Sequence, residues 1–115
     1  MDDARWIEGF PGGITVCDAD GVIVAMNARA AETFAGEGGR ALVGRRLVDC
    51  HPDRARPKVE ALLAGGRVNA YTIRKGGARK LIYQAPWRAA DGSHGGLVEI
   101  SLAIPDEMPH FDRGG

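Results

Sequence analysis

GGITVCDADGVIVAMNARAAETF, residues 12–34, decides the fold of this chain. Two apolar runs, at about 14–18 and 22–26, flank an Asp-Ala-Asp-Gly turn whose carboxylates can accept hydrogen bonds from their own backbone and whose glycine tolerates positive φ. Asn27 stands at an N-cap position ahead of the alanine-rich segment 28–35. The stretch therefore predicts a β-hairpin that leads directly into a short helix.

The rest of the chain predicts one further helix and three strands. The segment 41–48 is expected to be a helical turn and connector, and the helix at about 54–64 ends at a glycine pair. Three strand-like runs follow at about 67–74, 79–87 and 96–104, separated by glycine-containing turns, so we expect an antiparallel meander.

The last of these runs alternates in character. Its even-numbered residues from Val98 to Ile104 are apolar, whereas Glu99 and Ser101 are polar. Successive side chains of a strand point to opposite faces. We therefore expect the even-numbered residues on the core face and the odd-numbered ones on a wetter face.

The element order predicts an α+β fold with two strands first, helices next and three strands last. If the first strand pairs with the last, all five form one antiparallel sheet in the order 2-1-5-4-3, with short helices on one face. We expect a single domain over 1–104, a short tail over 105–115, and a pocket between helices and sheet.

Composition argues against several functions. The 115 residues include 15 basic and 15 acidic side chains, so no net charge favours nucleic acid or a membrane surface as a partner. The N-terminus lacks the basic start and apolar core of a signal peptide, and no apolar run is long enough to span a membrane, so we expect a cytoplasmic protein.

No familiar catalytic or metal-binding motif is present, and we expect no enzyme activity and no bound metal. Cys17 and Cys50 form no CxxC pair and are expected to be buried free thiols. The histidines have no spacing typical of zinc ligands.

Over about residues 9–104 the chain resembles a PAS domain. The hairpin and helix of residues 12–34 resemble the family's opening, LVGRRL (42–47) resembles its L-x-G-x-x-L segment, and DGSHG (91–95) resembles the turn before its last strand. The resemblance implies a sensory or interaction module without fixed catalytic residues. Family members bind varied cofactors, including haem and flavins, so the cofactor stays open.

LVDCHP, residues 47–52, resembles a Cys-His-Pro variant found in a branch of small bacterial PAS proteins. Flavin photosensors of the family carry a reactive cysteine directly after Gly-Arg-Asn. Here Gly44 is followed by two arginines and Leu47, which argues against such a photosensor. His51 lies near where haem-binding relatives place an iron ligand, but we favour a structural role for its ring.

Three hypotheses follow. The first is a small stand-alone sensor that binds an apolar or mixed-polarity ligand and signals through a homodimer or a partner protein. The second is a ligand-free dimerisation or interaction module, and the third is a haem sensor through His51. Tyr71, Tyr83 and Trp87 share a numerical parity that predicts a common sheet face. Apolar or aromatic character and expected facing predict the following pocket lining: Val24, Met26, Phe34, Leu47, His51, Leu62, Tyr71, Tyr83 and Ile100.

Overall fold

A five-stranded antiparallel sheet forms the centre of the computed structural model, which describes residues 4–50, 60–62, 64 and 67–115. The strand order is β2-β1-β5-β4-β3, which confirms the predicted topology. The strands are β1 (Gly13–Asp18), β2 (Ile23–Met26), β3 (Asn69–Lys75), β4 (Ala78–Arg88) and β5 (His94–Ile104).

The β1–β2 turn forms as its residues predict. One Asp18 carboxylate oxygen accepts hydrogen bonds from the backbone N–H groups of Asp20 and Val22, each at 3.0 Å. Gly21 has a φ of 81°, a conformation that costs glycine little. The turn therefore brings β2 back along β1, with a register shift between Val16 and Cys17.

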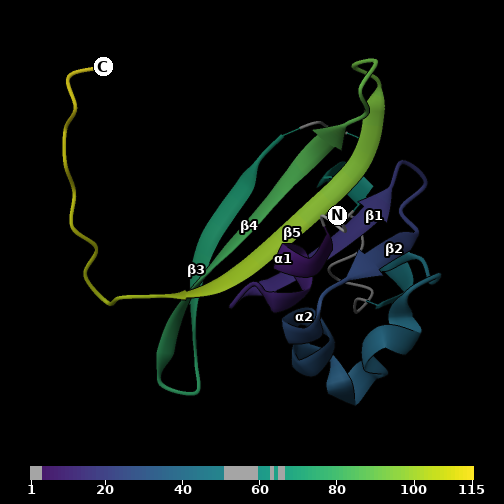
Figure 1. Cartoon of the computed structure of the whole chain (residues 1–115), viewed down its shortest axis with the longest axis horizontal. Helices are drawn as coiled ribbons and strands as arrows, with labels where there is room; N and C mark the ends of the chain where they lie inside the picture. Colours follow the sequence, from purple (N-terminus) through teal and green to yellow (C-terminus); the bar gives the residue numbers. More distant parts are fainter. Residues whose placement is uncertain (1–3, 51–59, 63, 65–66) are drawn as a thin grey trace.

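Short helices gather at the β1–β2 end of the sheet, while β4 and β5 extend well past them (Figure 1). Within the described residues, none is long and apolar enough to span a membrane. Of the helix expected at 54–64, residues 60–62 and 64 are described, and these are helical. The other described helices are α1 (Ala4–Gly9), α2 (Ala28–Thr33) and the 3-10 helices η1 (Ala35–Glu37), η2 (Gly39–Leu42) and η3 (Leu47–Cys50).

The Asn27 side chain forms hydrogen bonds with three elements, α1, β1 and α2. Its Oδ1 accepts hydrogen bonds from the backbone N–H of Ile14 at 2.9 Å and of Ala30 at 3.0 Å, and the second of these caps α2. Its Nδ2 donates to the carbonyl oxygens of Ile7 and Gly12, each at 2.9 Å. The predicted N-cap therefore also holds α1 and β1 in place.

The most tightly packed core lies under α2 and η2. Ile23, Met26, Ala30 and Leu42 are buried together, and Phe34 is among the partly buried side chains packed against them. This cluster lies at the β1–β2 end of the sheet, so the long β4 and β5 are only partly covered.

The two faces of β5 are the reverse of the prediction. In the antiparallel register Glu99 lies opposite Thr15, and both line the cavity on the helix side of the sheet. Val98, Ile100, Leu102 and Ile104 consequently lie on the other, outer face. Alternation within one strand shows that its faces differ but not which face the helices cover, and here the covered face holds a cavity that accepts polar side chains.

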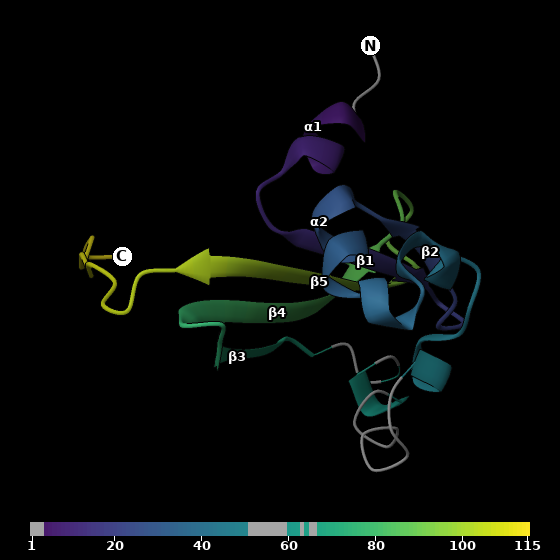
Figure 2. The same ribbon diagram turned by 90° about the horizontal axis from the view of Figure 1, so that it is seen from below.

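The segment after β5 leads away from the sheet without regular structure (Figures 1 and 2). Pro105 follows the last strand residue, as expected for a residue that cannot donate to a ladder. Arg74 forms an ion pair with Asp106 at 2.7 Å, which ties the start of this segment to β3.

Candidate ligand-binding site

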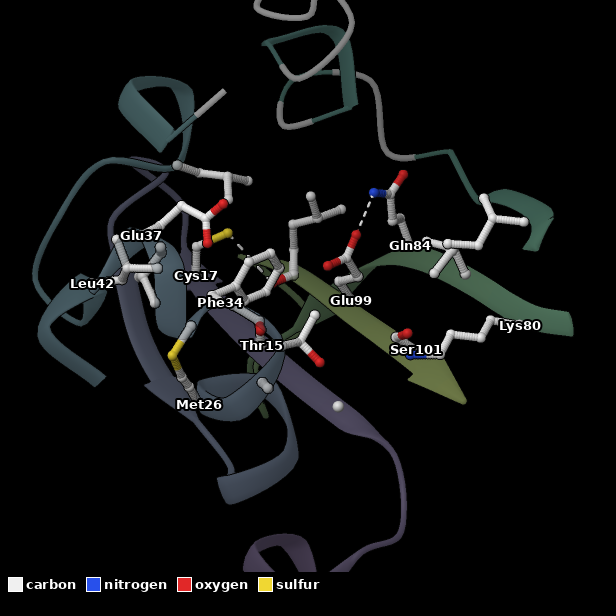
Figure 3. Close-up of a pocket in the computed structure, with 18 of the residues that line it drawn as sticks. Thr15, Cys17, Met26, Phe34, Glu37, Leu42, Lys80, Gln84, Glu99 and Ser101 are labelled. Atoms are coloured by element: carbon white, nitrogen blue, oxygen red, sulfur yellow. Dashed lines mark hydrogen bonds between the residues drawn. The ribbon is translucent and has the colours of Figure 1, made fainter. Parts of the chain in front are cut away.

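A cavity of about 340 Å³ lies between the helices and the inner face of the sheet. Figure 3 shows side chains from both layers converging on it, with Phe34 near its centre. Its apolar lining comes from Cys17, Ile23, Met26, Ala30, Phe34, Leu42, Leu47, Leu62, Ile73, Ile82 and Leu97.

A row of polar side chains crosses the sheet side of this cavity. Asn69 on β3 pairs with Gln84 on β4, which pairs with Glu99 on β5, which pairs with Thr15 on β1. The Asn69 Nδ2 donates to Gln84 Oε1 at 2.7 Å, and the Gln84 Nε2 donates to Glu99 Oε1 at 2.7 Å. Three neighbouring strands thus contribute one continuous hydrogen-bonded row.

The direction of these hydrogen bonds follows from their chemistry. An ionised carboxylate only accepts hydrogen bonds, so Gln84 must turn its NH₂ toward Glu99. Its carbonyl oxygen then faces β3, where the Asn69 amide donates to it. Glu99 is therefore the accepting end of the row, and it lies in the middle of the cavity wall (Figure 3).

Tyr71 lies at the edge of the cavity, where its side chain is 44% exposed. Partial burial, together with the negative charge of Glu99, raises the pKa of the Tyr71 hydroxyl above its ordinary value. The hydroxyl is therefore protonated at neutral pH and offers a hydrogen-bond donor on the side where Glu99 offers an acceptor.

Cys17 contributes an unreactive thiol to the cavity wall. It is a free cysteine, as predicted, and only 2% exposed, and its Sγ donates to the Leu97 carbonyl oxygen at 3.6 Å. Burial raises the pKa of the Cys17 thiol from 9.0 to about 11, so almost no thiolate forms at neutral pH. The side chain of Cys50 falls outside the described residues.

Five of the nine residues expected at the pocket line the cavity: Met26, Phe34, Leu47, Leu62 and Tyr71. They come from β2, α2, η3, the helical residues around 62, and β3. These five residues thus come from both the helical and the strand sides of the cavity.

Three expected lining residues, Val24, Tyr83 and Ile100, lie elsewhere. Val24 and Tyr83 are 48% and 39% exposed. Ile100 pairs with Tyr83, and both lie on the outer face of the sheet. For these residues the prediction of cavity lining was wrong.

The register between strands explains this error. Each odd-numbered residue of β3 pairs with an even-numbered residue of β4, so Tyr71 shares a face with Ile82 and not with Tyr83 or Trp87. A common numerical parity therefore does not mean a common face once the chain has turned. The Trp87 indole instead donates to the Cys17 carbonyl oxygen at 3.0 Å.

His51, the ninth expected residue, falls outside the described residues. The haem hypothesis that depends on it stays a prediction. Among the described residues, no three of the His, Cys, Asp and Glu side chains gather as a metal site.

Sequence reasoning missed the polar lining residues Thr15, Gln84 and Glu99. A usable signal was present, because each is a polar residue with an apolar or aromatic residue on either side of it in its strand. Alternation along β5 predicts a wetter face for Glu99, whereas the three side chains face one another across neighbouring strands and line the cavity.

A family model for the PAS fold matches residues 7–107, which is nearly the whole chain. This chain belongs to the PAS fold family. The match includes all five strands and the helices that enclose the cavity. No curated protein sequence matches the chain significantly.

Solved PAS domains share this architecture. The PAS domain of Bordetella pertussis BvgS is 22% identical, with a TM-score of 0.66 over 87% of this chain and 82% of that one. The PAS domain of the histidine kinase ThkA is 23% identical, with a TM-score of 0.63 over 79% of this chain and 97% of that one. At this level of identity the likeness concerns the fold.

A third similar structure is that of the Vibrio cholerae Aer2 receptor, described as a dual PAS-heme oxygen sensor. It is 14% identical, with a TM-score of 0.59 over 86% of this chain and 99% of that one. The ThkA and Aer2 structures thus come from a histidine kinase and from a receptor described as an oxygen sensor.

Proposed function

We propose that this PAS domain is a non-enzymatic sensory module that binds a small ligand between sheet and helices and signals through protein–protein contacts. The observation that carries the proposal is the cavity, which combines an apolar wall with a short row of oriented polar groups. Small-molecule sites are typically built in this way.

The chemistry of the wall supports binding over catalysis. The one thiol described there has a raised pKa and is hydrogen-bonded to a backbone carbonyl, so it is a poor nucleophile. The Glu99 carboxylate bonds to an amide, and among the described contacts no histidine or hydroxyl nucleophile pairs with it. These groups can hold a ligand without transforming it.

Strand β5 offers a route for the signal. Its odd-numbered residues Leu97, Glu99 and Ser101 touch the cavity, whereas its even-numbered residues Val98, Ile100 and Leu102 form part of the outer face. A ligand that shifts β5 therefore changes the outer face as well. We expect that face to contact a second copy or a partner signalling protein.

The same outer face favours the second candidate, a ligand-free interaction module. Tyr83 is exposed there, and the neighbouring apolar side chains of β5 are only partly buried. Partly exposed apolar residues on one sheet face are typical of contact surfaces. In this candidate the cavity stays empty and the outer face alone carries the function.

Mass spectrometry of protein purified without added ligand tests the proposal. Native and denatured masses are compared for the wild type, for Ser101→Phe, which places a ring in the cavity, and for Thr72→Phe, which changes an exposed position on the outer face. We expect a retained small-molecule mass in the wild type and Thr72→Phe but not in Ser101→Phe. Equal retention of the small molecule by the wild type and both variants would contradict cavity binding.

An absorption spectrum of the same samples tests the haem hypothesis. A Soret band that disappears in His51→Ala would support haem binding through His51. Colourless protein that reconstitutes no haem would eliminate that hypothesis and leave the ligand sensor and the interaction module.

A further inference from the structure

We propose that the cavity recognises small aromatic or heteroaromatic molecules that present a hydrogen-bond donor, above all a cationic nitrogen group, to Glu99. This inference rests on the proposed function and names the class of ligand. Four features of the described residues carry it. They are the donor-to-acceptor direction of the hydrogen bonds in the polar row, the unused acceptor capacity of Glu99, the surrounding charges and the apolar wall.

The polar row leaves Glu99 as an acceptor. Gln84 donates to one carboxylate oxygen, and Asn69 holds the Gln84 amide in that orientation. A carboxylate can accept about four hydrogen bonds, so Glu99 retains free acceptor sites. Asn69 is the positioning residue of the row, because it does not itself line the cavity.

No cation within the described part of the chain neutralises Glu99. The side-chain ion pairs found there join Arg40 to Glu8 and Arg74 to Asp106. Two lysines also line the cavity, but both lie far from Glu99. Lys80 is four residues along β4 from Gln84, about 13 Å along the strand, and Lys75 is six residues along β3 from Asn69, about 20 Å along the strand. Among the side chains that the structure describes, none therefore offsets the negative charge of Glu99 at the centre of the wall, and this favours a cationic group.

A second acidic residue lies on the helix side. Glu37 also lines the cavity, and Figure 3 places it near Cys17, on the opposite side of Phe34 from Gln84. Glu37 is exposed, so it adds to the negative field at the opening and leaves close recognition to Glu99.

The apolar wall suits a flat ring. Phe34 lines the same cavity as Glu99, together with Met26, Ile82 and Leu97. An aromatic ring gains from contact with Phe34 and from the soft thioether of Met26. A donor-bearing ring thus matches both the apolar and the polar parts of the wall.

Three probes of nearly equal shape test this inference: benzamidine, which is cationic, benzamide, which is neutral, and benzoate, which is anionic. Each is titrated into the full chain and followed by the backbone amide NMR signals of Gln84, Glu99 and Leu97. We expect affinity to fall from benzamidine to benzamide to benzoate, with at least a tenfold difference between the first and the last. This ranking uses the unmodified protein and does not depend on any variant.

Two variants test whether Glu99 causes the preference for the cationic probe. Glu99→Gln keeps the shape and removes the charge, so we expect benzamidine affinity to fall about tenfold while benzamide affinity changes less than twofold. The matched control Glu107→Gln removes a carboxylate from the exposed segment after β5, and we expect wild-type affinities for all three probes.

The outcomes separate the inference from the proposed function. Equal affinity for benzamidine and benzoate, or a Glu99→Gln variant that keeps the cation preference, would overturn the inference while cavity binding still stands. A cavity that admits indole but none of the three probes would also overturn it. A cavity that admits neither indole nor these probes would overturn the proposed function as well.

Discussion

Asn27 shows how much one side chain can organise. The Asn27 amide caps α2, accepts a hydrogen bond from the backbone N–H of Ile14 in β1 and donates one to the carbonyl oxygen of Ile7 in α1. Asn27 itself is only 1% exposed. Its removal leaves several buried backbone groups without partners, and such groups cost free energy when water cannot reach them. The residue is thus structural, although it lies beside the cavity wall.

We predict that Asn27→Ala lowers the free energy of unfolding by about 3 kcal/mol, through the lost cap and the unpaired buried groups. Denaturation by urea, followed by circular dichroism, measures the change. The control Asn69→Ala removes an amide from a half-buried position and should cost less than about 1 kcal/mol. Similar losses in the two variants would show that the Asn27 contacts contribute little.

Cys17 gives a prediction for pH. Burial raises its pKa in the folded protein from 9.0 to about 11, so the folded state disfavours the thiolate. The stability that this contributes is complete below about pH 9 and is lost as the pH rises toward 11.

The prediction is tested in Cys50→Ser protein, where Cys17 is the only thiol. At pH 8 we expect iodoacetamide to alkylate the folded protein at least tenfold more slowly than the urea-unfolded protein. Mass spectrometry reads the extent of reaction. Alkylation of the folded protein at the unfolded rate would show that the thiol is neither buried nor raised in pKa.

At the scale of elements, the contact between β1 and β5 decides whether the cavity can form, because it joins the N-terminal hairpin to the meander. Here Gly96 has a φ of 148°, and an added Cβ would lie 1.9 Å from the Cys17 carbonyl oxygen. The backbone atoms involved cannot move without breaking the ladder. Only glycine fits at this position.

Gly96→Ala should therefore destabilise the protein by more than about 3 kcal/mol or prevent folding altogether. Gly36→Ala is the matched control, since nothing lies within 4 Å of the added Cβ. We expect that control to be neutral or slightly stabilising. Thermal unfolding measures both variants, and a Gly96→Ala protein as stable as the wild type would contradict the close approach of the two strands.

The elements were predictable from sequence to different degrees. The β1–β2 turn and the N-cap depend on neighbouring residues such as Asp18, Gly21 and Asn27, and their chemistry is local. The faces of Tyr83 and Ile100 depend on the pairing of distant strands, which alternation within one strand does not contain. The Gln84–Glu99 contact has the same origin, and so it emerges only from the folded sheet.

On the scale of the whole molecule, the sheet separates two surfaces. Its inner face forms the cavity wall, and its outer face carries partly exposed apolar side chains from β4 and β5. We propose that the inner face binds the ligand and that the outer face makes the protein contacts. Substitutions on the two faces should therefore have separable effects.

We predict that Tyr83→Arg weakens self-association at least tenfold, because it places a charge within the apolar outer face. Sedimentation velocity over a range of concentrations measures the effect. Val43→Arg, at an exposed position outside the sheet, is the control and should associate like the wild type. Unchanged association of Tyr83→Arg would remove the outer face as the contact surface.

Methyl NMR during an indole titration shows whether the cavity admits a small molecule, as we propose. The Met26, Ile82 and Leu97 methyl groups report on the cavity, and those of Ile100 and Leu102 report on the outer face. We expect saturable chemical-shift changes confined to the first set. Shifts in the second set alone, or none that saturate, would contradict this expectation.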